Sequence, residues 1–152
     1  MRIARRTPQG FTLIELVIVV AIIAVLAGSM VPLFFANKLE AQKARASADL
    51  NAIKTAALLL HADTGKYPLT AVDTIDSTGR NLITNNDSYV NWNGPYMDDW
   101  RRDPFSTDDS PVTYRLRTVG NRLFAQCFGS DHADDIGADD DQILLITNDI
   151  TR

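Results

Sequence analysis

The chain has 152 residues, which is room for about one domain, and a formal net charge of −4. Three basic residues, Arg2, Arg5 and Arg6, lie in the first ten positions, so the rest of the chain carries 12 basic against 19 acidic side chains. This acidic remainder argues against bound nucleic acid, because phosphate contacts need clustered basic residues. A single cysteine, Cys127, excludes an internal disulfide.

Residues 11–36 form an apolar run whose only ionisable side chain is Glu15. As a helix it would be roughly 39 Å long, enough to cross ~30 Å of hydrocarbon, and it is too long for the apolar core of a cleavable secretory signal. The leader arginines should stay in the cytoplasm and place the C-terminal part outside. The run therefore predicts a single membrane span.

Glu15 needs a reason, because a charge at the centre of a span costs about 2.5–3.5 kcal/mol. A cut between Gly10 and Phe11 would create a cationic α-amino group one helical turn before Glu15. That group could pair with its own Glu15 or with that of a neighbouring helix, which favours side-by-side packing of many copies. A generic signal anchor with a stray glutamate is the alternative.

The stretch GFTLIELVIVVAIIAVLAG resembles the class III signal of type IV pilins and of the pseudopilins of type II secretion systems. The resemblance implies that a prepilin peptidase cuts after Gly10 and N-methylates Phe11, and that Glu15 guides subunit docking. It also implies a helical homo-oligomeric filament, an inner-membrane assembly platform and minor pseudopilins as partners. The implied location is the bacterial inner membrane, with a cytoplasmic leader, a periplasmic head and, after assembly, a periplasmic filament.

Apolar residues continue at helical spacing beyond the span, which predicts one helix over residues 11–63, roughly 80 Å long. Its second half carries a buried stripe of Leu39, Ala46, Leu50, Ile53, Ala57 and Leu60. We expect a kink at Pro32, since proline removes a helical hydrogen bond; a straight helix is the alternative. The resemblance also implies a role for Pro32 in assembly, because pilin helices can melt locally around this proline when packed in a filament. The segments are then a leader (1–10), a transmembrane and filament-core half (11–36) and an amphipathic half (37–63).

Residues 64–152 should form a globular head, with loops over 64–111 and a small sheet with an acidic loop over 112–152. Three runs, at 112–120, 122–129 and 143–147, are typical of short strands, and Gly120-Asn121 predicts a hairpin turn between the first two. The expected fold class is α+β, with the long helix packed on a small antiparallel sheet.

The head extends the resemblance to the major pseudopilins through DTGKYPLT, GPYMDDWRRDPF and the acidic loop GSDHADDIGADDDQI. Three features depart from it. Phe105 is followed by Ser106 rather than glycine, residues 77–93 have no counterpart that we can match, and Gln142 is an extra residue before Ile143.

Six aspartates crowd into residues 131–141, and their mutual repulsion favours a bound cation. Ca²⁺ takes six to eight oxygen ligands from flexible loops, and the resemblance implies a calcium loop here. The first candidate ligands are Asp131, Asp139 and Asp140, followed by Asp134, Asp135 and Asp141. A solvated acidic turn without metal is the alternative.

The sequence thus favours a non-enzymatic structural subunit of a pseudopilus, the filament of a type II secretion system. A second hypothesis is a major or minor type IV pilin that forms surface pili for adhesion, motility or DNA uptake. A third is a membrane-tethered enzyme or binding head that uses the span only as an anchor.

Overall fold

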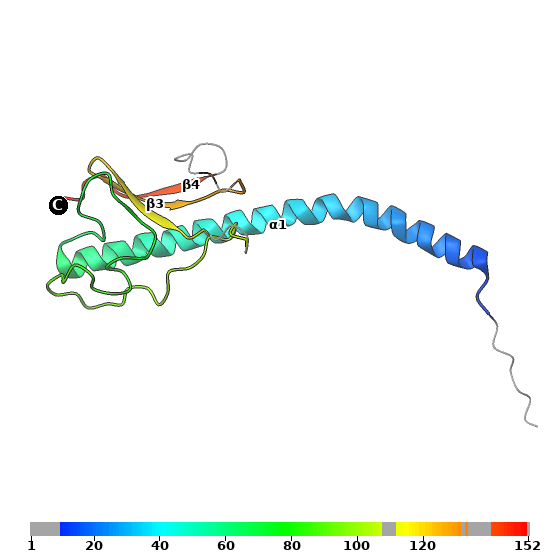
Figure 1. Ribbon diagram of the computed structural model, residues 1–152, viewed down its shortest axis with the longest axis horizontal. Helices are drawn as coiled ribbons and strands as arrows, with labels where there is room; N and C mark the ends of the chain where they lie inside the picture. The colour runs from blue at the N-terminus through cyan, green and yellow to red at the C-terminus, as the bar shows by residue number, and fades with distance from the viewer. Residues whose placement is uncertain (1–9, 108–111, 132, 134–140, 152) are drawn as a thin grey trace, which may run out of the picture. The chain divides into compact units, whose positions relative to one another are not determined.

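The computed structural model describes residues 10–107, 112–131, 133 and 141–151. The chain divides into two compact units, Met1–Glu40 and Ala41–Arg152. One helix, α1 (Leu13–Thr64), has 52 residues, begins in the first unit and ends in the second (Figure 1). The single long helix expected over residues 11–63 is therefore confirmed.

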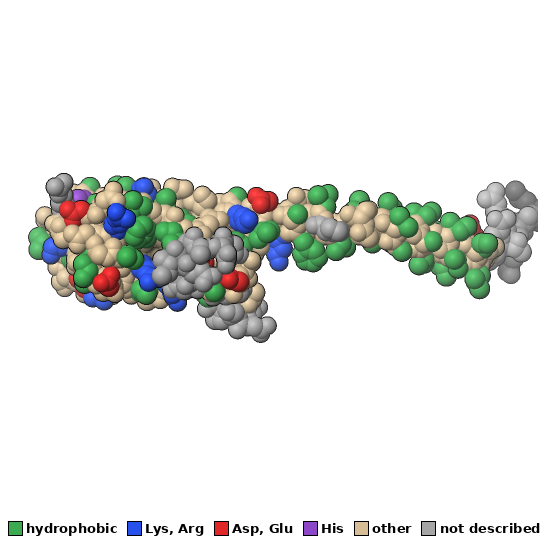
Figure 2. Space-filling model, turned by 90° about the horizontal axis from the view of Figure 1, so that it is seen from above, with side chains coloured by type: hydrophobic (Ala, Val, Ile, Leu, Met, Phe, Trp, Pro, Cys, Tyr) green, Lys and Arg blue, Asp and Glu red, His purple; other side chains and the backbone are tan. Residues whose placement is uncertain are grey.

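The part of α1 in the first unit is strongly apolar and buries none of this surface against the other described residues. The large hydrophobic side chains from Phe11 to Phe35 are between 44% and 80% exposed, and Figure 2 shows hydrophobic side chains distributed along this segment. By length and composition α1 is able to cross a membrane. The helix continues through Pro32 without interruption; the kink expected there stays a prediction.

In the second unit α1 buries one stripe. Ala46, Leu50, Ile53, Ala57 and Leu60 are at most 3% exposed, as the helical spacing predicts. The helix ends as the sequence indicates. Gly65 adopts a positive φ of 68° and its N–H donates to the His61 carbonyl at 2.8 Å, which satisfies one of the last free carbonyl groups.

A four-stranded antiparallel sheet follows in the order β1-β2-β3-β4. Its strands are β1 (Ile75–Asp76), β2 (Arg115–Val119), β3 (Arg122–Cys127) and β4 (Gln142–Thr147). The three expected strands and the α+β class are confirmed, and the two-residue turn at Gly120-Asn121 takes its positive φ, 55°, at the glycine. The short edge strand β1 comes from the loop region, where no particular strand position was foreseen.

The core of the head lies between this sheet and α1 (Figure 1). Leu116 of β2 lies opposite Ala125 of β3, and both are fully buried, as is Leu123. Burying one leucine or isoleucine side chain contributes about 1.5–3 kcal/mol, so Ile53 and Leu60 on α1 make the helix an integral part of the head.

Residues 77–93, which the resemblance does not cover, fold around the buried amide of Asn81. Its Nδ2 donates to the Pro68 carbonyl at 3.0 Å and to Asp87, and its Oδ1 accepts from the Asp87 N–H at 3.0 Å. The backbone carbonyl of Asn81 accepts from the Trp92 indole at 2.7 Å. Arg80 forms a two-pronged ion pair with Asp87, which lowers the pKa of that carboxyl group. The segment is thus an ordered loop with its own polar core.

Asp49 connects α1 to the sheet and to the loop before it. Its side chain is 11% exposed; the carboxylate accepts a hydrogen bond from the Tyr114 hydroxyl at 2.8 Å and pairs with the Arg101 guanidinium at 3.1 Å. Arg45, one turn earlier on α1, approaches the same carboxylate at 3.6 Å. These partners offset the hydration that the Asp49 carboxylate loses on burial.

We predict that Asp49→Ala destabilises the head by about 2 kcal/mol, because it leaves the buried Tyr114 hydroxyl without an acceptor and removes two ion pairs with arginines that are largely exposed. Tyr114→Phe, which removes only one donor, should cost about 1 kcal/mol. Urea unfolding of the detergent-solubilised full chain, followed by tryptophan fluorescence, measures both. Equal effects of the two changes would show that the ion pairs contribute nothing.

Candidate functional site

The first candidate site is the start of α1, where Gly10, Phe11 and Glu15 lie within two turns of one another. Phe11 is 79% exposed, and the space where a Cβ on Gly10 would stand contains no other atom within 4 Å. The fold therefore gives no steric reason for a glycine at position 10.

Thr12 and Glu15 form a reciprocal cap on the helix. The Glu15 N–H donates to Thr12 Oγ1 at 3.3 Å, while the Thr12 N–H and hydroxyl reach Glu15 Oε2 at 3.4 and 3.3 Å. This is the Thr-x-x-Glu capping box, which satisfies N–H groups that a helix start leaves free. A carboxylate in the first turn is also stabilised by the helix dipole.

The cap gives Glu15 a task in the isolated chain that the sequence reasoning missed. The signal was readable, since Thr12 stands three residues before Glu15 and directly ahead of an apolar helix. Only Oε2 is engaged: Oε1 accepts no hydrogen bond from any residue that the structure describes. Glu15 can therefore cap its own helix and still offer one oxygen to a cation.

The second candidate site is the acidic loop, of which the structure describes the two ends. Asp141 Oδ1 accepts from the Gly129 N–H at 3.0 Å and Oδ2 from the Gln126 side chain at 3.2 Å, so Asp141 closes the base of the loop. Asp131 Oδ1 accepts from the Ala133 N–H at 2.9 Å. The extra Gln142 donates from Nε2 to the Lys43 carbonyl at 3.3 Å and ties this base to α1.

The other candidate ligands lie outside the described residues. These are Asp134, Asp135, Asp139 and Asp140. Among the described residues, no three His, Cys, Asp or Glu side chains lie close enough together to hold a metal ion. Asp131 and Asp141 are thus the two ligand candidates whose surroundings are known, and each already accepts hydrogen bonds within the loop.

Asp103 holds the chain in place where β3 ends and the acidic loop begins. It is 2% exposed, and its two oxygens accept from the N–H groups of Phe105 at 2.9 Å and Phe128 at 2.7 Å, which joins the Asp-Pro-Phe turn to the end of β3. Ser106, the departure from the family pattern, accepts from the Val112 N–H through its hydroxyl at 3.0 Å. A glycine at position 106 could not make that bond.

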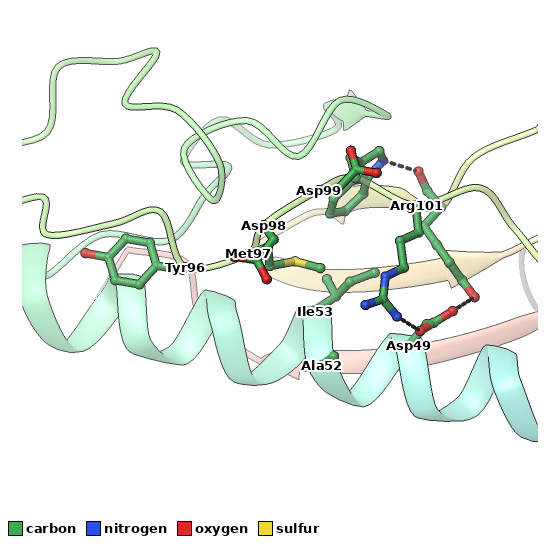
Figure 3. Close-up of a pocket in the computed structure, with 10 residues that line it drawn as sticks. Asp49, Ala52, Ile53, Tyr96, Met97, Asp98, Asp99 and Arg101 are labelled. Atoms are coloured by element: carbon green, nitrogen blue, oxygen red, sulfur yellow. Dashed lines mark hydrogen bonds and ion pairs between the residues drawn. The ribbon is translucent and has the colours of Figure 1, made fainter.

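A third feature, with no counterpart in the sequence-based candidates, is a hollow of about 210 Å³ between α1 and residues 96–101. Figure 3 shows Ala52 and Ile53 on α1 and Met97 on the facing loop. Arg101 reaches down to Asp49 at one end, and Asp98 and Asp99 lie on the loop at the rim. The hollow thus combines an apolar floor with charged edges.

Burial and the neighbouring Asp49 carboxylate raise the pKa of the Tyr114 phenol far above its ordinary value. Tyr114 therefore stays protonated and remains a hydrogen-bond donor to Asp49. Because Arg45 and Arg101 also pair with Asp49, the charge of this carboxylate is matched within the head. Asp98 and Asp99 have no such match: neither forms an ion pair with a residue that the structure describes.

Two family models match the chain. The prokaryotic N-terminal methylation motif covers residues 5–31, which include the Gly10–Phe11 junction and the Thr12–Glu15 cap. The model described as PilW, C-terminal, covers residues 37–118, more than half of the chain.

Curated relatives match over shorter stretches. The type II secretion system core protein G of Escherichia coli K12 is 40% identical over 62 residues, and that of Dickeya chrysanthemi is 37% identical over 65. These matches cover 41–43% of this chain and 42–43% of those relatives. The type IV major pilin protein PilA of Myxococcus xanthus is 39% identical over 69 residues, 44% of this chain and 31% of that protein.

No solved structure matches the chain. The stretches of this chain that align with the three curated relatives span less than half the length of each relative. The N-terminal motif, the capped apolar helix and the family model over residues 37–118 lead to the same assignment. The chain belongs to the type IV pilin and pseudopilin family.

Proposed function

We propose that this protein is a structural, non-enzymatic subunit that polymerises into the pseudopilus of a type II protein secretion system. The observation that carries the proposal is the first half of α1. This apolar helix begins with the Thr12–Glu15 cap and has no buried residue in its most apolar stretch. Such a helix needs lipid or other copies of itself around it. The relatives named core protein G support the secretion branch.

The processing step acts on the Gly10–Phe11 junction. A prepilin peptidase cuts after Gly10 and methylates the new amino group of Phe11. The exposure of Gly10 and Phe11 supports this role, because a peptidase has to reach the bond between them. The cut removes the basic leader and leaves the apolar helix intact.

The mature chain first rests in the bacterial inner membrane as a single-pass protein with its head in the periplasm. Assembly then replaces lipid around α1 with neighbouring copies. The free Oε1 of Glu15 supports a pairing with the α-amino group of a neighbour's Phe11, since each buried charge needs a partner in an apolar environment. The membrane assembly platform extracts the subunits from the inner membrane, and minor pseudopilins initiate the filament.

A surface pilus is the second candidate function. The match to the Myxococcus xanthus major pilin favours it, because that relative aligns over a stretch as long as those of the secretion proteins. A pilus and a pseudopilus would use the same junction, cap and apolar helix. The two functions are therefore distinguished by the phenotype of a deletion: loss of protein export or loss of surface fibres.

The test is deletion of this chain in its host, with re-expression of the unaltered chain, a Glu15→Gln variant or a Glu15→Leu variant. For a pseudopilus, deletion should leave specific proteins in the periplasm while surface fibres persist. The Glu15 variants should fail to restore export although they are inserted in the membrane. Loss of surface fibres with an unchanged medium would instead establish the pilus.

The same cells supply the control for processing. Mass spectrometry of the unaltered chain should show an N-methylated Phe11 as the first residue. An intact Met1 terminus in cells that do export normally would contradict both filament functions and support an anchored head.

We also propose that the acidic loop binds Ca²⁺. The proposal is supported by six aspartates in residues 131–141 and by a loop base that Asp141, Gly129 and Gln142 already hold in place. Since both oxygens of Asp141 accept hydrogen bonds, Asp131, Asp139 and Asp140 remain the first choices as ligands.

We predict that millimolar calcium raises the melting temperature of the head by several degrees over excess chelator, because a ligand that binds only the folded state stabilises it. Scanning calorimetry of the full chain in detergent measures the shift, with magnesium as the control ion. Asp139→Asn with Asp140→Asn should abolish the shift, and Asp98→Asn should leave it unchanged. Equal melting temperatures in calcium and chelator would rule the site out.

A further inference from the structure

The rim of the hollow beside α1 carries two negative charges without an internal partner. Asp98 and Asp99 are exposed, and neither forms a hydrogen bond or an ion pair with a residue that the structure describes. The floor below them is apolar, with Ala52, Ile53 and Met97 (Figure 3). A site of this kind fits a lysine side chain, whose alkyl stem packs on apolar surface while its ammonium group stays at a charged rim.

A matching cation lies on the same helix. Lys54 forms no ion pair with any described residue, and its side chain is half-buried. It follows Ala52, which lines the hollow, by two positions, so the two side chains leave the helix about 160° apart. One helical turn beyond Lys54, Leu58 is 42% exposed. The flank opposite the hollow therefore presents a cation beside an uncovered leucine.

Two other cations of the head, Lys66 and Arg122, also form no ion pair with a described residue, but they fit less well. Lys66 already lies over the Tyr89 ring, 5.1 Å from its centre. Arg122 is next to the turn between β2 and β3 rather than on α1. Lys54 lies at the same height along α1 as Ala52 and Ile53, which line the hollow. If two copies lie side by side with parallel helices, Lys54 of one copy therefore comes next to the hollow of the other.

We propose that Lys54 of one copy enters the hollow of the next copy and pairs there with Asp98 and Asp99. This inference rests on the proposed filament function and specifies the contact between its heads. The two surfaces are different patches on opposite flanks, so the contact is head-to-tail and each copy keeps one free flank for a further copy. Attraction between the rim and Lys54 also fixes the register of neighbouring heads.

Charge reversal with rescue tests the contact in cells that express the full chain. Lys54→Glu alone, and Asp98→Lys with Asp99→Lys, should each lower the fraction of subunit in sedimentable fibres by about tenfold or more, because like charges then meet. The triple variant restores attraction and should recover to within about threefold of the unaltered chain. Lys66→Glu, the matched control, changes the same charge away from the contact and should assemble normally.

The inference is overturned if the single-flank variants assemble like the unaltered chain. It is also overturned if the triple variant assembles as poorly as they do while its melting temperature is unchanged. Should a variant unfold, coupling of unaltered fibres with a carbodiimide decides instead. That reagent joins ammonium and carboxylate groups in contact, so peptide mapping should find Lys54 linked to Asp98 or Asp99.

Linked peptides from other lysines without any from Lys54 would overturn the contact.

Failure of the inference differs from failure of the proposed function. Fibres that form normally in every variant contradict only the head contact. An unaltered chain that never leaves the membrane as fibres contradicts the filament itself, and the head contact falls with it.

Discussion

An apolar helix that the chain cannot cover determines the behaviour of this protein. The seventeen large hydrophobic side chains between Phe11 and Phe35 are all at least 44% exposed, and covering them is worth on the order of 20 kcal/mol. The cost of carrying Glu15 into an apolar environment, about 3 kcal/mol, is small beside this. Lipid and other copies of the same helix can both supply the cover, so one segment can serve membrane insertion first and assembly afterwards.

The head buries an apolar core of its own between α1 and the sheet, and polar contacts join elements that are distant in the sequence. Asp49 joins α1 to Tyr114 and Arg101, and Asp103 joins the turn at Phe105 to the end of β3. These buried carboxylates have their hydrogen bonds satisfied, as a stable core requires. Asp98, Asp99 and Lys54, by contrast, form no ion pair with a residue that the structure describes, so their charges are available for contacts with another copy.

Much of this could be read from the sequence, since helix, turn and cap signals are local. The 3.6-residue spacing gave the buried stripe of α1, and Gly120-Asn121 gave the hairpin. Edge strand β1 and the ordered loop around Asn81 could not be foreseen, because each depends on partners many residues away: Arg117 for Ile75 and Pro68 for Asn81. The hollow beside α1 was missed for the same reason. It forms only when Met97 and Ala52 face each other across the fold.

The claim that one apolar surface exchanges lipid for copies of itself is tested most directly by a spin label in the span. A nitroxide on an Ala24→Cys variant of the full chain is selective, because Cys127 is fully buried. In membranes the label should be mobile, accessible to oxygen and free of spin–spin broadening. In purified fibres it should be immobilised and broadened by neighbouring labels. Spectra that stay the same in membranes and fibres would contradict the account.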